Sequence, residues 1–180
     1  VINWARGRGL FTGEDPIKMA ELSLPKTKQS KNHFKSLNYN EMPSLFEEIE
    51  ASSATTQTKL ALQFTILTCC RTTEVLNSNW VEIDLVKAIW TIPAERMKAG
   101  EPHSVPLSSK ALNILEEANK LGTGNGLIFP SSIDNKPMSD GTMRKLLQKT
   151  LGIEATVHGF RSTFKDWAAE TTNHSNEVSE

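Results

Sequence analysis

The spacing of apolar residues predicts a chain made mostly of helices. Between residues 40 and 49, apolar residues recur every three or four positions and glutamates fall between them, which is the pattern of an amphipathic helix. The apolar positions are Met42, Leu45, Phe46 and Ile49. The stretch KLALQFTILTCC, residues 59–70, follows the polar break SSATTQ and is almost wholly apolar, so we expect a helix buried in the core.

Three further helices are indicated downstream. They cover residues 109–122, 141–152 and 158–168, the last with an apolar face of Phe160, Phe164 and Trp167. Side chains that can cap a helix precede the first two, and a glycine stands where each should end. These residues are Ser108 or Ser109 with Gly122, and Ser139 or Asp140 with Gly152.

A different pattern between residues 80 and 107 predicts a small antiparallel sheet of three strands. WVEIDL, AIWTIP and HSVPL are short β-rich runs with a tendency to alternate, and residues 98–101 separate the second from the third as a hairpin turn would. LIFPSS, residues 127–132, is expected to be a brief buried strand or an extended piece. The fold class is therefore α+β and mostly α-helical.

The N-terminal stretch has weaker patterning. VINWARGRGL indicates the end of a helix broken at Gly7 and Gly9, and LPKTKQSKNHFK, residues 24–35, indicates a linker. Val1 is expected to be an internal residue of a longer protein. The last residues, NHSNEVSE, resemble the approach to another helix.

Composition is that of an ordinary globular chain. The 180 residues are 38% hydrophobic and 23% charged, with no apolar run of membrane-spanning length and no secretory signal at the start. Cys69 and Cys70 are adjacent, which excludes a disulfide framework and favours a reducing cytoplasm. We expect Trp80, Trp90 and Trp167 to be core residues rather than surfaces for base stacking.

The distribution of charge matters more than its total. A net charge of −1 and a pI near 6.5 argue against a nucleic-acid partner. However, residues 1–40 hold seven basic and three acidic groups, a net +4, which leaves −5 for the remainder. This basic segment fits either a solvated linker or an arm along a polyanion. Its basic residues are Arg6, Arg8, Lys18, Lys26, Lys28, Lys31 and Lys35.

Four polar residues are candidates for chemistry. Arg71 follows a long apolar run, and Glu74 one turn later can hold its guanidinium, although a surface ion pair at a helix end would look the same. His158 and Arg161 project from one side of a helix, where arginine suits phosphate and histidine can exchange protons near neutral pH. A core histidine next to a surface arginine would give the same sequence pattern. Lys98, taken alone, is an ordinary lysine in a turn.

Together these stretches resemble a known family. HGFRSTFKDWAAE resembles the HxxR box of the tyrosine recombinases, or phage integrases, and is close to integrases of prophages and genomic islands. TIPAERMKAGEPHSVPLS is similar to the hairpin that carries the catalytic lysine, and TCCRTTEVLNSNWVEIDL to the first arginine box. KNHFKSLNYNEMPSLFEEI resembles the entry helix of the catalytic domain. Three ordered boxes make a specific signal.

The resemblance implies a domain organisation and a set of roles. Residues 1–24 would be the end of a core-binding domain, 25–36 a linker, and 37–180 a catalytic domain that is incomplete at its C-terminus. Arg71 and Arg161 would bind the oxygens of the scissile phosphate, Lys98 would protonate the departing 5′ oxygen, and His158 would assist at the attacking phenol. Glu74 would support Arg71. The intermediate would be a 3′-phosphotyrosyl bond, with no metal or other cofactor.

This sequence departs from the family at two places. Cys69 stands where recombinases commonly carry glycine, so the turn before Arg71 is expected to be built differently. The nucleophilic tyrosine of the family lies downstream of the HxxR helix, and the one tyrosine here, Tyr39, precedes every box. We therefore expect no nucleophile in this chain, and a fragment that does not cleave DNA although the longer protein would.

The resemblance also implies partners. They would be double-stranded DNA attachment sites, three further protomers in a homo-tetramer on DNA, and accessory DNA-bending or excision factors, in the bacterial cytoplasm at the nucleoid and not at a membrane. The candidates for DNA contact are Lys26, Lys28, Lys31, Lys35 and His103. Two alternatives remain: a non-catalytic DNA-binding or regulatory relative, and a helical interaction module in which Arg71, Lys98, His158 and Arg161 lie far apart.

Overall fold

The chain forms two units, which are described separately. The computed structural model describes residues 2–13, 34–97, 99–122, 126–134 and 136–174, and the units comprise residues 1–32 and 33–180. In the first unit, α1 spans Ile2–Gly7, as expected from the glycines that follow. There the Arg8 guanidinium lies 4.7 Å from the centre of the exposed Trp4 ring.

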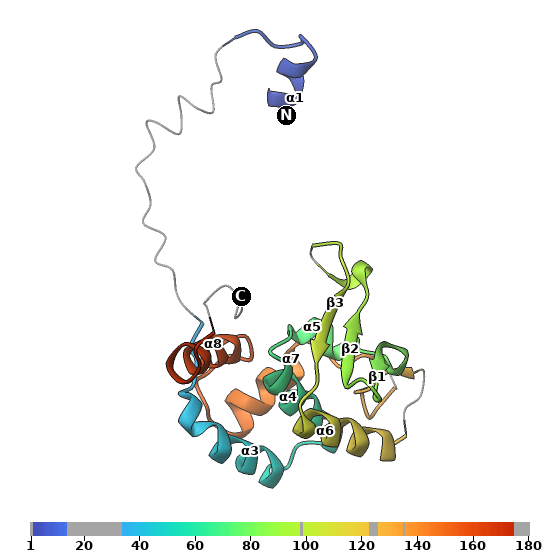
Figure 1. Ribbon diagram of the computed structural model, residues 1–180, viewed down its shortest axis with the longest axis vertical. Helices are drawn as coiled ribbons and strands as arrows, with labels where there is room; N and C mark the ends of the chain where they lie inside the picture. The colour runs from blue at the N-terminus through green and yellow to red at the C-terminus, as the bar shows by residue number, and fades with distance from the viewer. Residues whose placement is uncertain (1, 14–33, 98, 123–125, 135, 175–180) are drawn as a thin grey trace. The chain divides into compact units, whose positions relative to one another are not determined.

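The second unit contains the elements that were expected from the sequence, α-helical for the most part, with a small sheet (Figure 1). No helix among the described residues is long and apolar enough to span a bilayer. In chain order the elements are η1 Tyr39–Glu41, α3 Met42–Ala51, α4 Thr56–Thr68, α5 Thr72–Leu76, η2 Trp80–Glu82, β1 Ile83–Asp84, β2 Ile89–Ile92, η3 Ala94–Arg96, β3 His103–Pro106, α6 Ser109–Lys120, α7 Gly141–Lys145, η5 Leu146–Thr150 and α8 Phe160–Thr171.

Helix α4 is the centre of this unit. It contacts α3, α5, α6 and α7, and most of its residues from Leu60 to Ile66 are buried, which confirms the prediction from its apolar run. Phe64 of α4 lies 5.5 Å from Trp90 of the sheet and 5.4 Å from Phe129, ring centre to ring centre. The three rings are fully buried and tie the helices to the sheet.

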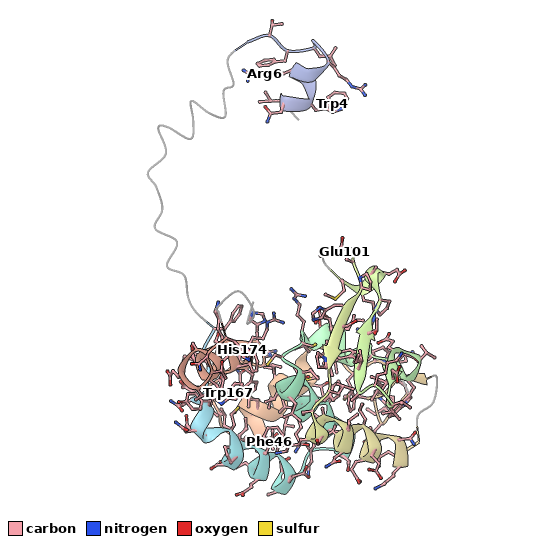
Figure 2. The ribbon with its side chains drawn as sticks, viewed as in Figure 1. Trp4, Arg6, Phe46, Glu101, Trp167 and His174 are labelled. Carbon is pink, nitrogen blue, oxygen red and sulfur yellow. The ribbon has the colours of Figure 1, made fainter. Side chains whose placement is uncertain are left out.

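The sheet has the predicted antiparallel order β1-β2-β3. Trp90 pairs with Ile83 on one side and with Val105 on the other, so its ring points into the core with Ile92. In Figure 1 the sheet stands to one side of α4 and α8 to the other. Glu101 lies far out in the connection between β2 and β3 (Figure 2).

Capping explains where the longer helices begin and end. The Ser108 hydroxyl accepts from the Ala111 amide at 3.3 Å, as predicted for the start of α6, and Gly122 and Gly152 both have φ near +70° where helices stop. Asp140 is at the cap position of α7, but its side chain makes no capping hydrogen bond.

The segment after α7 differs from the expected regular helix. It continues as a π-helical turn, η5, in which the wider backbone lets the neighbouring residues Leu146 and Leu147 both turn into the core. The stretch 127–132 is extended outside the sheet, with isolated bridges from Leu127 to Asn79 and from Pro130 to Pro137.

The prediction of a core role for Trp167 is wrong. Phe164 and Trp167 each remain 41% exposed, whereas Phe160 and Ala168 of the same helix are buried. The two exposed rings lie on the expected face, 5.6 Å apart, but they line an apolar hollow beside Tyr39.

Candidate active site

The turn between α4 and α5 presents Arg71. Cys69 ends α4 in a left-handed conformation with φ 53° and ψ 21°, and Arg71 then takes an extended conformation at the start of α5. The Glu74 carboxylate accepts from the Arg71 amide at 2.7 Å and from its Nη1 at 2.6 Å. Glu74 is buried while the Arg71 side chain is 45% exposed, so one edge of the guanidinium is fixed and the other is open.

Arg161 joins the last helix to this turn. It lies in the first turn of α8, and its Nη1 donates to the Cys69 carbonyl at 2.8 Å, a contact between residues 92 positions apart. Cys69 is two residues before Arg71. Two arginines that are distant in sequence therefore meet at one short turn: Arg71 belongs to it, and Arg161 is hydrogen-bonded to it.

His158 completes the cluster. Its pKa is lowered from the ordinary value, first by burial and then by the positive charges of Arg161 and Arg71. The Phe34 ring packs edge-on against the imidazole with 4.5 Å between ring centres. Among the described residues, no side chain or carbonyl hydrogen-bonds to either imidazole nitrogen, and the lowered pKa favours the neutral ring, which can accept a proton.

A tight contact fixes the position of this histidine. The Thr156 amide donates to the Lys35 carbonyl at 2.9 Å, and a side chain at Gly159 would come within 2.2 Å of that same oxygen. Glycine is therefore required between His158 and Arg161. Sequence analysis missed this role, because the HxxR pattern leaves the middle positions open and Lys35 had been assigned to a linker.

The arrangement suits an anionic diester. Two guanidinium groups and an imidazole of lowered pKa converge, and among the described residues Glu74 is the carboxylate that pairs with Arg71. The neighbouring thiols are poor nucleophiles, because burial raises the pKa of Cys69 to about 11 and that of Cys70 to about 12. Within the described ranges, no three His, Cys, Asp or Glu side chains are grouped as a metal site would require.

The remaining predicted site residues are five lysines and His103. Lys98, Lys26, Lys28 and Lys31 lie outside the described residues. The exposed Lys35 Nζ forms an ion pair with Glu154 at 2.6 Å. His103 is exposed on β3, opposite Ile92.

Tyr39 is engaged elsewhere. Its hydroxyl donates to the Glu170 carboxylate at 2.8 Å, and this hydrogen bond raises its pKa. That Tyr39 is not the nucleophile stays a prediction, which rests on its position before every box.

A partly buried arginine beside the cluster was not predicted. Arg96 donates to the Glu74 carbonyl at 2.9 Å and pairs with Glu82, whose Oε2 also accepts from the Trp90 indole at 2.9 Å. The signal in the sequence was Trp90, since a buried indole N–H needs an acceptor and Glu82, at the end of η2, is a nearby acidic residue.

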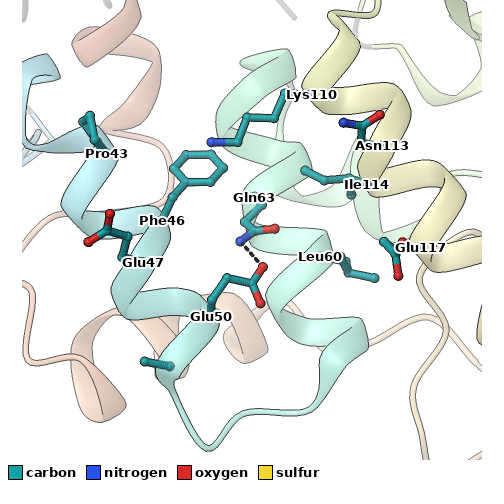
Figure 3. A pocket seen from close by; sticks show the side chains of 11 residues that line it. Pro43, Phe46, Glu47, Glu50, Leu60, Gln63, Lys110, Asn113, Ile114 and Glu117 are labelled. Atoms are coloured by element: carbon teal, nitrogen blue, oxygen red, sulfur yellow. Dashed lines mark hydrogen bonds between the residues drawn. The ribbon is translucent and has the colours of Figure 1, made fainter.

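A groove between α3, α4 and α6, of about 840 Å³, contains none of the cluster residues (Figure 3). The Lys110 ammonium lies over the Phe46 ring there, 3.8 Å from its centre. Carboxylates of Glu47, Glu50 and Glu117 line the groove. Their charge disfavours a phosphate, so this groove is not a site for DNA.

Comparison with known proteins shows the family and agrees with the fold. Residues 35–178 match the model of the phage integrase family. The chain is 34% identical to the prophage integrase IntA of Escherichia coli over 164 residues, which is 90% of this chain and 39% of that protein. It is 29% identical to the integrase of Enterobacteria phage P4 over 147 residues, 72% of this chain and 33% of the phage protein.

Solved structures share the fold at low identity. A lambda integrase dimer bound to a core site matches with a TM-score of 0.67 and 19% identity, over 99% of this chain and 65% of that one. XerA recombinase matches with a TM-score of 0.62 and 17% identity, over 90% and 64% of the two chains. The chain thus spans well under half of the curated relatives it matches, and by sequence and fold it belongs to the phage integrase family.

Proposed function

We propose that this chain is the catalytic part of a site-specific DNA recombinase that integrates a mobile element by cutting and rejoining DNA strands. The observation that carries the proposal is the convergence of Arg71, His158 and Arg161 on the turn after α4. Family membership and the names of the relatives support the same activity.

The proposed chemistry is phosphoryl transfer to a tyrosine. The phenol oxygen bonds to phosphorus while the bond from phosphorus to the 5′ oxygen breaks, and the electron pair leaves with that oxygen. His158 takes the phenol proton, and Lys98 gives a proton to the 5′ oxygen. Arg71 and Arg161 hold the non-bridging oxygens, on which charge builds in the transition state. We assign the attack to a tyrosine other than Tyr39, because Tyr39 precedes every box.

The partners follow from that chemistry. The substrate is a duplex attachment site, bound by Lys26, Lys28, Lys31, Lys35 and His103 in addition to the cluster. A lambda integrase tetramer bound to a Holliday junction has the same fold with a TM-score of 0.66, and we propose a tetramer on DNA here too. Accessory DNA-bending or excision factors would assist. The enzyme acts on the bacterial nucleoid in the cytoplasm.

The decisive experiment is covalent trapping. The protein, extended downstream to include a tyrosine, is incubated with a nicked duplex from the ends of its own genetic element, and the adduct is resolved by denaturing electrophoresis. Arg71→Ala and Arg161→Ala should each reduce the rate of adduct formation by about a hundredfold or more. Lys120→Ala, which removes a surface lysine paired with Glu116 and Glu117, should not.

Each result separates the candidate functions. Adduct formation that survives both arginine substitutions would refute the roles given to Arg71 and Arg161. DNA binding without any adduct, in the presence of a downstream tyrosine, would favour the non-catalytic relative instead.

A further inference from the structure

The guanidinium of Arg96 connects three elements next to the candidate active site. It projects from η3, its Nη1 donates to the Glu74 carbonyl of α5, and its Nη2 pairs with Glu82 of η2. Its side chain is 22% exposed and that of Glu82 is 10% exposed. The Trp90 indole holds the same Glu82 oxygen from the buried face of β2.

Both groups that Arg96 contacts are themselves fixed. Glu74 holds Arg71 through its carboxylate while its carbonyl accepts from Arg96, so one residue joins the two arginines. Glu82 is held by Trp90, a fully buried core residue. The position of η3 relative to Arg71 is therefore set by a short chain of polar contacts.

Stability alone does not account for this arrangement. The Arg96 Nε is buried and has no hydrogen-bond partner among the described residues. A buried ion pair with an unsatisfied donor is commonly no more stable than apolar side chains of similar volume. The ion pair between Arg96 and Glu82 instead fixes the position of η3, which lies early in the connection from β2 to β3.

We propose that Arg96 is a positioning residue for general acid catalysis. It fixes the start of the β2–β3 connection relative to Arg71, and Lys98 follows it by only two residues. The inference rests on the proposed function, in which Lys98 protonates the departing 5′ oxygen. Arg96 itself does not contact the substrate.

The test uses a leaving group that needs no acid. Adduct formation by the tyrosine-containing protein is measured on a normal duplex and on one with sulfur in place of the 5′ bridging oxygen. A thiolate leaves without protonation, because a thiol is far more acidic than an alcohol. Lys98→Ala is the reference for loss of the acid, and Lys87→Gln, from an exposed ion pair with Asp84 in the same sheet, is the control.

We expect Arg96→Gln to slow cleavage of the normal duplex by about a hundredfold, as a misplacement near 1 Å can do. On the sulfur-containing duplex, Arg96→Gln and Lys98→Ala should both return to within about threefold of the wild type, and Lys87→Gln should match the wild type on both. Arg71→Ala should remain slow on both duplexes, because its role is to stabilise charge on the phosphate.

The proposal would be overturned if Arg96→Gln slowed adduct formation equally on both duplexes, or if it slowed adduct formation on neither. If Arg96→Gln does not fold by circular dichroism, Glu82→Gln replaces it, since it removes the charge that holds Arg96, and the same outcomes decide. A wild type that forms no adduct on either duplex would instead refute the proposed function, and this inference with it.

Discussion

Cys69 has a backbone conformation that L-amino acids rarely adopt. Its φ of 53° ends α4 and directs its carbonyl to the Arg161 guanidinium. Only glycine enters the left-handed region without a steric penalty. This chain forms the turn with a cysteine, so the backbone at Cys69 is strained.

Replacing Cys69 separates this strain from the packing of the thiol. Cys69→Gly should be more stable than Cys69→Ala by about 1 kcal/mol, because both variants lack the thiol and only glycine relieves the left-handed conformation. Urea denaturation measures the difference. Ala88, which also has a φ of 53°, is the matched control, and Ala88→Gly should shift stability in the same direction. If Cys69→Gly were less stable than Cys69→Ala, the backbone at Cys69 would not be strained.

His158 makes stability depend on pH. Burial, Arg161 and Arg71 lower its pKa, so as pH falls the unfolded chain binds the proton before the folded chain does. The contribution of His158 is therefore present above its ordinary pKa of 6.5 and is lost as pH falls through that value toward the folded-state pKa. His158→Phe, which keeps an aromatic ring beside Phe34, should show a smaller loss of stability between pH 7.5 and about pH 5.

The pKa itself can be followed directly. In an NMR titration, His158 should titrate below 6.5 in the wild type, and Arg161→Gln should raise its pKa because a like charge is removed. A duplex bound at the cluster should also raise it, since phosphate neutralises the arginines. A His158 pKa at or above 6.5 in the free protein would contradict the proximity of the three groups.

At the scale of elements, the site depends on how the segment 34–37 packs against α8. The Thr163 hydroxyl donates to the Leu37 carbonyl at 2.7 Å, and the Lys35 carbonyl accepts from Thr156 beside Gly159. These contacts bring Phe34 onto His158. The beginning of the unit thus fixes the N-terminal end of the helix that carries Arg161.

Gly159→Ala tests this packing. The added Cβ would lie 2.2 Å from the Lys35 carbonyl oxygen, and because the neighbour is backbone it cannot move aside cheaply. We expect a loss of about 2 kcal/mol in unfolding free energy and faster hydrogen exchange at the Thr156 amide. Gly141→Ala, where the nearest atom is 3.9 Å away on Arg144, should change stability by less than about 1 kcal/mol. Equal effects of the two substitutions would show that the close approach is unimportant.

At the scale of the whole molecule, the core belongs to residues 33–180. Its buried residues run from Leu45 to Ala168, with Phe64, Trp90 and Phe129 at the centre. A unit with its own core should unfold cooperatively by itself. The segment 1–32 holds six basic and three acidic residues, a net charge of +3, so we expect it to act on DNA binding rather than on folding.

Two variants separate these contributions. Removal of residues 1–32 should leave the unfolding midpoint of the remainder within a few degrees, measured by circular dichroism. In the full chain, the combined substitutions K26Q, K28Q and K31Q should weaken DNA binding and reduce the slope of log affinity against log salt by about 3, if each lysine meets one phosphate. An unchanged slope would mean that this segment is a solvated linker.

The sequence by itself determined the elements and the family. The apolar run of α4, the alternation around Trp90 and the cap at Ser108 are local patterns, so they predicted the helices and the sheet correctly. The ion pair between Arg71 and Glu74 could also be predicted, because the two residues lie one turn apart. Short-range geometry follows from spacing along the chain.

Only the tertiary structure decided which distant groups meet. The bond from Arg161 to the Cys69 carbonyl, the support of Glu74 by Arg96 and the contact of Lys35 with Gly159 each join segments that no sequence period relates. The exposure of Trp167 was likewise decided by what packs on α8, not by its place on an apolar face. Periodicity fixes the direction of a side chain on its own element, whereas its partner depends on how the elements pack.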